Sequence, residues 1–300
     1  RFDDRITGKT SAFAVNSKKI HVDIDPSEIG KNVKVDVALA GDVKDTLGSL
    51  LPLVQHHSRT AWLERMADLE HDHPSISVPD SDVMTPQYVL RELNKIVEHS
   101  VEPVVVTGVG QHQMWTAQFM FMPSVNSFVS SGGLGVMGFE VPAAIGAQVA
   151  RPQSTVWSVA GDAGFQMTLQ ELGTIAQEHL PVKIAIINNG YSGMVRQWQE
   201  QFYDHHYKAV AVSSPDYVKL ADAYGISARK VTDKSDVGFA LAQAESHPGP
   251  FLLDFAVAPE ENVYPMVPPG ASLAETVEDP KIVHRREPTH IWPEGLVSYP

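Results

Sequence analysis

The sequence predicts an α/β protein, in which a parallel β-sheet is covered by helices on both faces and is preceded by the end of a second α/β domain. Strand-like and helix-like segments alternate along the chain beyond residue 85. The strand-like segments, such as residues 103–110 and 181–190, are rich in Val and Ile and are hardly interrupted by polar residues. Runs of this kind are typical of parallel strands that are buried on both faces.

The periodicity of apolar residues predicts the elements of this sheet domain. Helical spacing is found over residues 86–100, 141–150, 168–180, 217–225 and 237–247. Strand patterns lie over residues 103–110, 154–162, 181–190 and 249–258. Thr168 and Glu171 have the T-x-x-E spacing of a capping box, so Glu171 is interpreted as a helix cap rather than a catalytic carboxylate. Gly225 is expected to end its helix as a C-cap.

Changes in composition predict the domain boundaries. Strand patterns at 18–25 and 33–39, the second alternating as in a half-buried strand, precede a helical pattern at 43–54. A polar segment with one helical pattern follows, and the C-terminal residues are rich in proline, as in an arm that lies over the surface. The predicted parts are the end of one domain at 1–55, a linker at 56–84, the main domain at 85–264 and the arm at 265–300.

Charge and composition argue against several function classes. The net charge of −13 argues against binding to a nucleic-acid backbone. No apolar stretch reaches the roughly 18 residues that span a bilayer, and no signal peptide is recognised. The lack of cysteine excludes disulfides and thiolate metal sites and fits the cytoplasm. His71 and His73 flank Asp72, but this trio lacks a further ligand and is interpreted as part of a solvated linker.

Two polar residues follow neighbouring strand patterns in the main domain. Asp162 ends one strand pattern and Asn189 ends the next, with one helical segment between them. In a right-handed βαβ unit both strands point the same way, so both side chains are expected at the carboxyl edge of the sheet, where α/β proteins bind ligands. Carboxylate and amide oxygens suit Mg²⁺ or Ca²⁺.

A diphosphate is the expected partner of such a cation. Gly161, Ala163 and Gly164 are small enough for the backbone to approach phosphate oxygens, and the N-terminus of the following helix favours their charge. The alternative is an ordinary strand-end turn followed by an Asn-Gly turn. The combination at crossover spacing favours a metal–diphosphate site.

The motif GD-x26-N closely resembles the thiamine diphosphate (ThDP) motif of ThDP-dependent enzymes. Three further segments resemble the catalytic subunit of the acetolactate synthase (acetohydroxyacid synthase) family: GVGQHQMW at 108–115, SGGLGVMGFEVPAAIGAQ at 131–148 and NNGYSGMVRQWQEQFY at 188–203. RFDDRITGK at 1–9 and HVDIDPSEIGKN at 21–32 are similar to the end of that family's central, FAD-binding domain. The resemblance implies the ThDP-binding fold for the main domain.

The resemblance also implies roles for particular residues. Asp162, Asn189 and the backbone carbonyl of Tyr191 would hold Mg²⁺ against the diphosphate. Met137 would lie beneath the bent cofactor. Without the resemblance, a Met in a glycine-rich loop would be interpreted as an ordinary residue of the hydrophobic core. The remaining residues implied at the ThDP site are Gly110, Gln111, His112, Gly161, Ala163, Gly164, Gly193 and Met194.

The implied activity is the condensation of pyruvate with a second 2-ketoacid, pyruvate or 2-ketobutyrate, with release of CO₂. This is the first common step of branched-chain amino acid biosynthesis. Trp198 matches the residue that favours 2-ketobutyrate, and Arg5 matches an arginine near the substrate channel. FAD is mostly structural in this family. The residues implied at FAD are Arg1, Asp3, Arg5, Asp23, Ile24, Asp42, Val43, Gln113 and Met114.

The chain departs from the family in one respect. No residue matches the family's essential glutamate, which lies in an N-terminal domain. The sequence also begins at Arg1, within a polar loop pattern, so we expect that an N-terminal part is missing and that the chain alone does not turn over. The family's active site forms between two subunits, so a homodimer or homotetramer is expected, with a possible small regulatory subunit, in the bacterial cytoplasm.

Three alternatives stay open at this point. One is another flavin-containing ThDP enzyme, either pyruvate oxidase-like or glyoxylate carboligase-like. Another is a non-catalytic fragment that binds ThDP and Mg²⁺ without activating the cofactor. A generic NAD-binding domain is weaker, because GVGQHQ lacks the third glycine of G-x-G-x-x-G.

Overall fold

A computed structural model of the protein describes residues 2–78, 81–122 and 124–281, which form two compact units. The first unit contains residues 2–75 together with the described residues from 264 onward. The second unit contains residues 76–263. No helix in the described ranges combines the length and apolar character that crossing a membrane requires.

The second unit is built on a parallel sheet, as the sequence predicts. Within the described residues the sheet has six strands in the spatial order β4-β3-β5-β6-β8-β7, and all neighbouring pairs are parallel. The strands are β3 (Val104–Thr107), β4 (Phe128–Ser130), β5 (Val156–Gly161), β6 (Lys183–Asn188), β7 (Ser227–Val231) and β8 (Phe251–Ala256).

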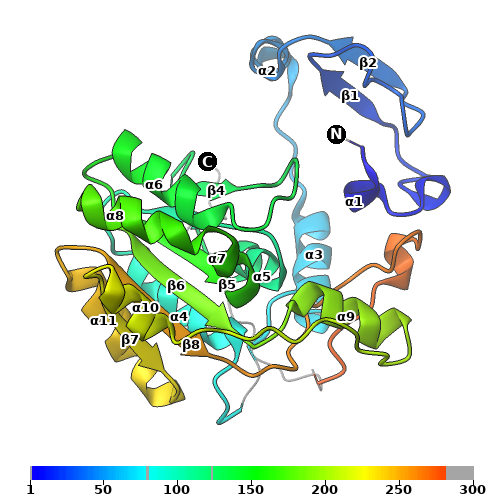
Figure 1. The fold of residues 1–300 in the computed structure, drawn as a ribbon. Helices are drawn as coiled ribbons and strands as arrows, with labels where there is room; N and C mark the ends of the chain where they lie inside the picture. Colours follow the sequence, from blue (N-terminus) through cyan, green and yellow to red (C-terminus); the bar gives the residue numbers. More distant parts are fainter. Residues whose placement is uncertain (1, 79–80, 123, 282–300) are drawn as a thin grey trace. The chain divides into compact units, whose positions relative to one another are not determined.

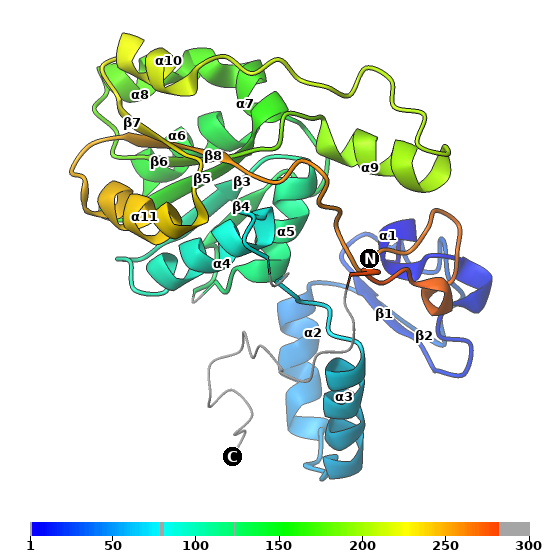
Figure 2. The ribbon, with the colours of Figure 1, turned by 90° about the horizontal axis from the view of Figure 1, so that it is seen from below.

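Helices cover both faces of this sheet, as expected (Figures 1 and 2). One face carries α4 (Pro86–Val97), α5 (Gln111–Phe119) and α11 (Val237–Ser246), the last preceded by the 3₁₀ turn η4 (Lys234–Asp236). The other face carries α6 (Glu140–Ala150), α7 (Asp162–Thr168), α8 (Leu172–Gln177) and α10 (Tyr217–Ala223). Helix α9 (Gly193–Phe202) begins shortly after the carboxyl end of β6.

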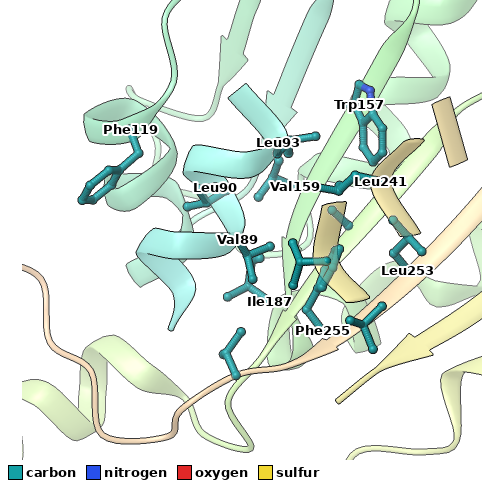
Figure 3. Close-up of a cluster of buried hydrophobic side chains, with 14 of the residues drawn as sticks. Val89, Leu90, Leu93, Phe119, Trp157, Val159, Ile187, Leu241, Leu253 and Phe255 are labelled. Atoms are coloured by element: carbon teal, nitrogen blue, oxygen red, sulfur yellow. The ribbon is translucent and has the colours of Figure 1, made fainter. Parts of the chain in front are cut away.

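Each face of the sheet has its own apolar core. On the α4 and α11 face, Leu90, Trp157 and Phe255 are fully buried, and Figure 3 shows side chains of α4, α11 and the strands meeting there. On the other face, Phe165 packs edge to face against Tyr217, with ring centroids 5.3 Å apart. Burial on both faces explains why these strands are apolar at successive positions and do not alternate.

The structure also contains elements that the sequence did not predict. Among them are α5, the three-residue strand β4 and the strand β7, whose sequence SARKV is mostly polar and partly exposed. Helix α10 ends as expected, because Gly225 follows it with a φ of +71° and donates to the Asp222 carbonyl.

The predicted helix at 168–180 is wrong in its form. The helical segment begins at Asp162 and is interrupted by a 3₁₀ turn, η3 (Leu169–Glu171), before α8. The predicted capping box is also wrong: the Thr168 hydroxyl donates to the Gly138 carbonyl at 2.9 Å, and Glu171 Oε2 accepts from Thr174 Oγ1 at 3.2 Å. The Thr168 hydroxyl, which the local spacing predicted as a helix cap, therefore forms its hydrogen bond with a residue distant in sequence.

The first unit contains a pair of parallel strands, β1 (Ile20–Asp23) and β2 (Val37–Ala40). The strand predictions are confirmed here, but all four residues of β2 are exposed, so the expected half-burial is wrong for this chain. Residues 264–281 belong to this unit, and Lys9 N–H donates to the Ala271 carbonyl. Its helical segments are α1 (Asp4–Thr7), η1 (Thr10–Ala12), α2 (Val43–Leu50), η2 (Leu51–Leu53), α3 (Thr60–Asp72) and η5 (Leu273–Glu275).

Candidate functional site

The candidate site lies at the carboxyl edge of the sheet, where the strand order reverses. From β3 the chain goes to β4 on one side, and β5 then pairs with the other side of β3. Such a reversal opens a crevice between the loops that follow the two central strands. A cavity of about 340 Å³ lies at this edge, lined by residues that follow β3, β5 and β6.

This cavity brings together all the residues that the sequence implied at the ThDP site. They are Gly110, Gln111, His112, Met137, Gly161, Asp162, Ala163, Gly164, Asn189, Tyr191, Gly193 and Met194. Gln113 and Met114, implied at FAD, line the same cavity. The lining residues that the sequence analysis missed are Val109, Trp115, Gly135, Ile187, Ser192 and Val195.

Asp162 is a buried carboxylate held by the turns around it. Its Oδ1 accepts from Ala163 N–H at 3.0 Å, and its Oδ2 accepts from Ser214 Oγ at 3.4 Å. Burial raises the pKa of Asp162 to about 6, although hydrogen bonds from the amides of Ala163 and Gly190 oppose the rise. The Gly190 contact places this carboxylate against the turn after β6. Ser214 is distant in sequence and carried no local signal.

Asn189 is positioned by the same turn and by α5. Its Oδ1 accepts from Tyr191 N–H at 3.1 Å, and its Nδ2 donates to Gln111 Oε1 at 3.3 Å. Gln111 Nε2 in turn donates to Gln197 Oε1 at 2.9 Å. A Cβ on Gly193 would meet the Gln111 carboxamide and would lie 2.9 Å from Asn189 Nδ2, so only glycine leaves room for this arrangement.

His112 presents a neutral imidazole at the cavity. Burial lowers its pKa to about 4, so the ring is uncharged at neutral pH. A Cβ on Gly161 would lie 2.7 Å from His112 Nδ1, which explains the small residue at that position. His112 Nε2 is buried and has no hydrogen-bond partner among the described residues. A buried polar atom without a partner beside a cavity fits a ligand with hydrogen-bonding oxygens.

The donor set at the edge fits Mg²⁺ with a diphosphate. One carboxylate, Asp162, and one amide, Asn189, face the same cavity, and Mg²⁺ usually takes one or two carboxylates and completes its shell with phosphate oxygens. Nowhere in the described ranges, this edge included, do three His, Cys, Asp or Glu side chains gather as a metal site.

Trp198 lies outside the cavity, in a groove along α9. Its ring is 40% exposed and packs edge to face on Phe202, with centroids 5.4 Å apart. The groove shares Met194 and Val195 with the cavity, so the two adjoin along the helix.

The residues implied at FAD fall in both units, and Arg1 lies outside the described residues. Asp3 and Asp23 line a cavity of about 340 Å³ in the first unit, and Arg5 forms an ion pair with Asp3 at 3.0 Å. Ile24 and Val43 are exposed, and Asp42 caps α2 by accepting from the amides of Lys44 and Asp45. Gln113 and Met114 are in the second unit.

Glu140 is a residue near the site that the sequence analysis did not single out. Its side chain is fully buried, and neither carboxylate oxygen has a partner among the described residues. The carboxyl packs between Gly108 and Gly164: a Cβ on Gly164 would lie 2.9 Å from Glu140 Oε1. Burial raises the pKa of Glu140 to about 7. The sequence gives one indication that Glu140 is unusual, because this charged residue lies inside the apolar segment GFEVPAAIG.

Comparison with protein families gives two matches. The family described as "Thiamine pyrophosphate enzyme, C-terminal TPP binding domain" matches residues 108–255, which contain nearly the whole candidate site. The family described as "Thiamine pyrophosphate enzyme, central domain" matches residues 1–50. The first match lies within the second unit of the structure, and the second match lies within the first unit.

Curated relatives carry names that agree with these families. The chain is 46% identical over 285 residues to the acetolactate synthase large subunit of Porphyra purpurea, covering 92% of this chain and 48% of that protein. It is 44% identical over 288 residues to the acetolactate synthase of Mycobacterium leprae, covering 92% of this chain and 46% of that protein. The chain thus spans about half the length of the curated relatives it matches. The chain belongs to the thiamine pyrophosphate-dependent enzymes, and the curated relatives named above are acetolactate synthases.

Proposed function

We propose that this chain carries the cofactor-binding part of an acetolactate synthase. The proposed reaction is the ThDP- and Mg²⁺-dependent condensation of pyruvate with pyruvate or 2-ketobutyrate, with release of CO₂, in branched-chain amino acid biosynthesis. The observation that carries the proposal is the cavity at the carboxyl edge, where the loops after β3, β5 and β6 place Asp162, Asn189 and His112 together.

Different residues of the cavity are proposed to bind Mg²⁺ and the diphosphate. Asp162, Asn189 and the Tyr191 carbonyl would hold Mg²⁺, while the backbone at Gly161–Gly164 would approach the diphosphate oxygens. His112, neutral and with an unpartnered Nε2, would offer a hydrogen bond to a phosphate oxygen without adding charge. ThDP would supply the electron sink for decarboxylation, and the protein orients it.

Other residues would act on cofactor shape and on the substrates. Met137 lines the cavity and is proposed to support the bent cofactor. Trp198, in the adjoining groove, is proposed to favour 2-ketobutyrate as the second substrate. Arg5 is proposed to bind a substrate carboxylate with its planar guanidinium.

FAD is proposed as a structural cofactor of the first unit. The cavity lined by Asp3 and Asp23 supports this proposal, because a carboxylate at a strand end can accept from ribose hydroxyls. A homodimer or homotetramer, a small regulatory subunit and a cytoplasmic location complete the proposal.

A second candidate is a non-catalytic cofactor-binding fragment. In that case the chain would bind ThDP and Mg²⁺ in this cavity without activating the cofactor.

The first experiment measures acetolactate formation from pyruvate with ThDP, Mg²⁺ and FAD, on the chain alone and with a supplied N-terminal segment. Activity only with the segment is the expected result. Activity of the chain alone would refute the assignment of a missing glutamate. ThDP binding without acetolactate in either case would favour the non-catalytic candidate or another flavin-containing ThDP enzyme.

A further inference from the structure

Arg196 of α9 is a buried cation that contacts two aromatic rings. Its side chain is 8% exposed. The guanidinium carbon lies 5.2 Å from the centre of the Tyr191 ring and 4.8 Å from the centre of the Tyr207 ring. Desolvated cation–π contacts of this kind favour one fixed orientation of the planar group.

Glu200 compensates the charge of Arg196 from the next turn of α9. Arg196 Nη1 donates to Glu200 Oε2 at 2.7 Å. The same carboxylate accepts from Asn262 Nδ2 at 2.7 Å and from the Tyr207 hydroxyl at 3.0 Å. Burial alone would raise the pKa of Glu200, but these hydrogen bonds and the nearby cation lower it overall, so the carboxylate is ionised at neutral pH. Each charge in this pair therefore has its partner.

The two tyrosines belong to segments that are also joined through the backbone. Ser192 N–H donates to the Val210 carbonyl at 2.8 Å, and Val212 N–H donates to the Gly190 carbonyl at 2.9 Å. Tyr191 therefore lies in a turn paired with the segment that follows Tyr207. Arg196 ties the side chains of both segments to α9.

We propose that Arg196 is a positioning residue that fixes the turn at Gly190–Ser192, and with it the Tyr191 carbonyl, for a divalent cation. This inference rests on the proposed function, in which that carbonyl is a Mg²⁺ ligand. A lysine at this position would keep the charge but lose the contact of a planar guanidinium with both rings and the forked hydrogen-bond geometry of arginine. The turn would then sample positions in which the carbonyl does not face the cation.

The test measures ThDP binding as a function of Mg²⁺ concentration. Binding is detected by the change in tryptophan fluorescence, to which the cavity residue Trp115 contributes. Arg196→Lys is expected to raise the half-saturating Mg²⁺ concentration about tenfold, the lower end of the loss seen when outer-shell partners of a metal site are changed. ThDP binding at saturating Mg²⁺ should change much less. The matched control is Arg229→Lys, because Arg229 lies 5.1 Å over Phe239 and pairs with Asp236 at 3.2 Å but lines no part of the cavity.

A second variant keeps the inference testable if Arg196→Lys fails to fold. Tyr191→Leu keeps the backbone carbonyl but removes one of the rings that Arg196 contacts, and it is also expected to raise the Mg²⁺ requirement. An unchanged Mg²⁺ requirement in both variants would overturn the inference, as would an equal loss of ThDP binding at every Mg²⁺ concentration. If the unmodified protein shows no Mg²⁺-dependent ThDP binding, the proposed function itself fails, and this inference fails with it.

Discussion

At the residue scale, Glu140 is the least expected feature of the site. A buried carboxyl without a hydrogen-bond partner is costly when ionised. Below about pH 7 the folded protein holds it as a neutral acid, because burial raises its pKa from 4.5 to about 7. The neighbours of the carboxyl, Gly108 and Gly164, lie at the end of β3 and in the first turn of α7.

The titration of Glu140 predicts how stability depends on pH. Between pH 4.5 and 7 the unfolded chain releases this proton while the folded protein keeps it, so the free energy of unfolding falls as pH rises. The loss approaches about 3 kcal/mol by pH 7 and then levels off. Glu140→Gln removes the titration, so the variant should gain stability relative to the unmodified protein from pH 5 to pH 8.

Urea unfolding at pH 5 and pH 8, followed by tryptophan fluorescence, measures this difference for both proteins. A stability difference between variant and unmodified protein that is the same at both pH values would contradict the prediction.

At the scale of elements, the turn from β6 into α9 depends on one glycine. Gly193 is the first residue of α9, and any side chain there would displace the Gln111 and Asn189 side chains from the cavity edge. Gly193→Ala should therefore weaken Mg²⁺-dependent ThDP binding by at least about tenfold, because the ligands no longer reach one site.

Calorimetric titration with ThDP and Mg²⁺ tests this expectation. Gly146→Ala is the matched control, because a Cβ there meets nothing within 4 Å and lies in α6. The control should bind normally and gain up to about 1 kcal/mol of stability from its higher helix propensity. Normal binding by Gly193→Ala would show that the glycine is not required for the site.

At the scale of the whole molecule, the second unit has the sheet, both apolar cores and the cavity within residues 76–263. A fragment of these residues is expected to fold cooperatively, because its core side chains find their partners inside the unit. Circular dichroism and thermal unfolding of the purified fragment test this. A non-cooperative transition, with loss of helical signal at room temperature, would show that the first unit is needed for folding.

The parallel sheet and the approach of Asp162 and Asn189 to one edge could be predicted from the amino-acid sequence. Apolar periodicity is a local property, and parallel neighbouring strands bring their carboxyl ends to one edge. Resemblance to a family added the identities of the other cavity residues. Whether these residues hold ThDP and Mg²⁺ stays a prediction.

Features that depend on partners distant in sequence could be seen only in the three-dimensional structure. The polar strand β7 exists because β8 pairs with it, and β8 lies between β6 and β7, an order that no local pattern encodes. The Thr168 hydroxyl donates to the carbonyl of Gly138, 30 residues away in the sequence, and does not form the predicted cap. The burial of Glu140 and the stacking of Arg196 likewise follow from packing between elements, because the environment of a side chain is set by its neighbours in space.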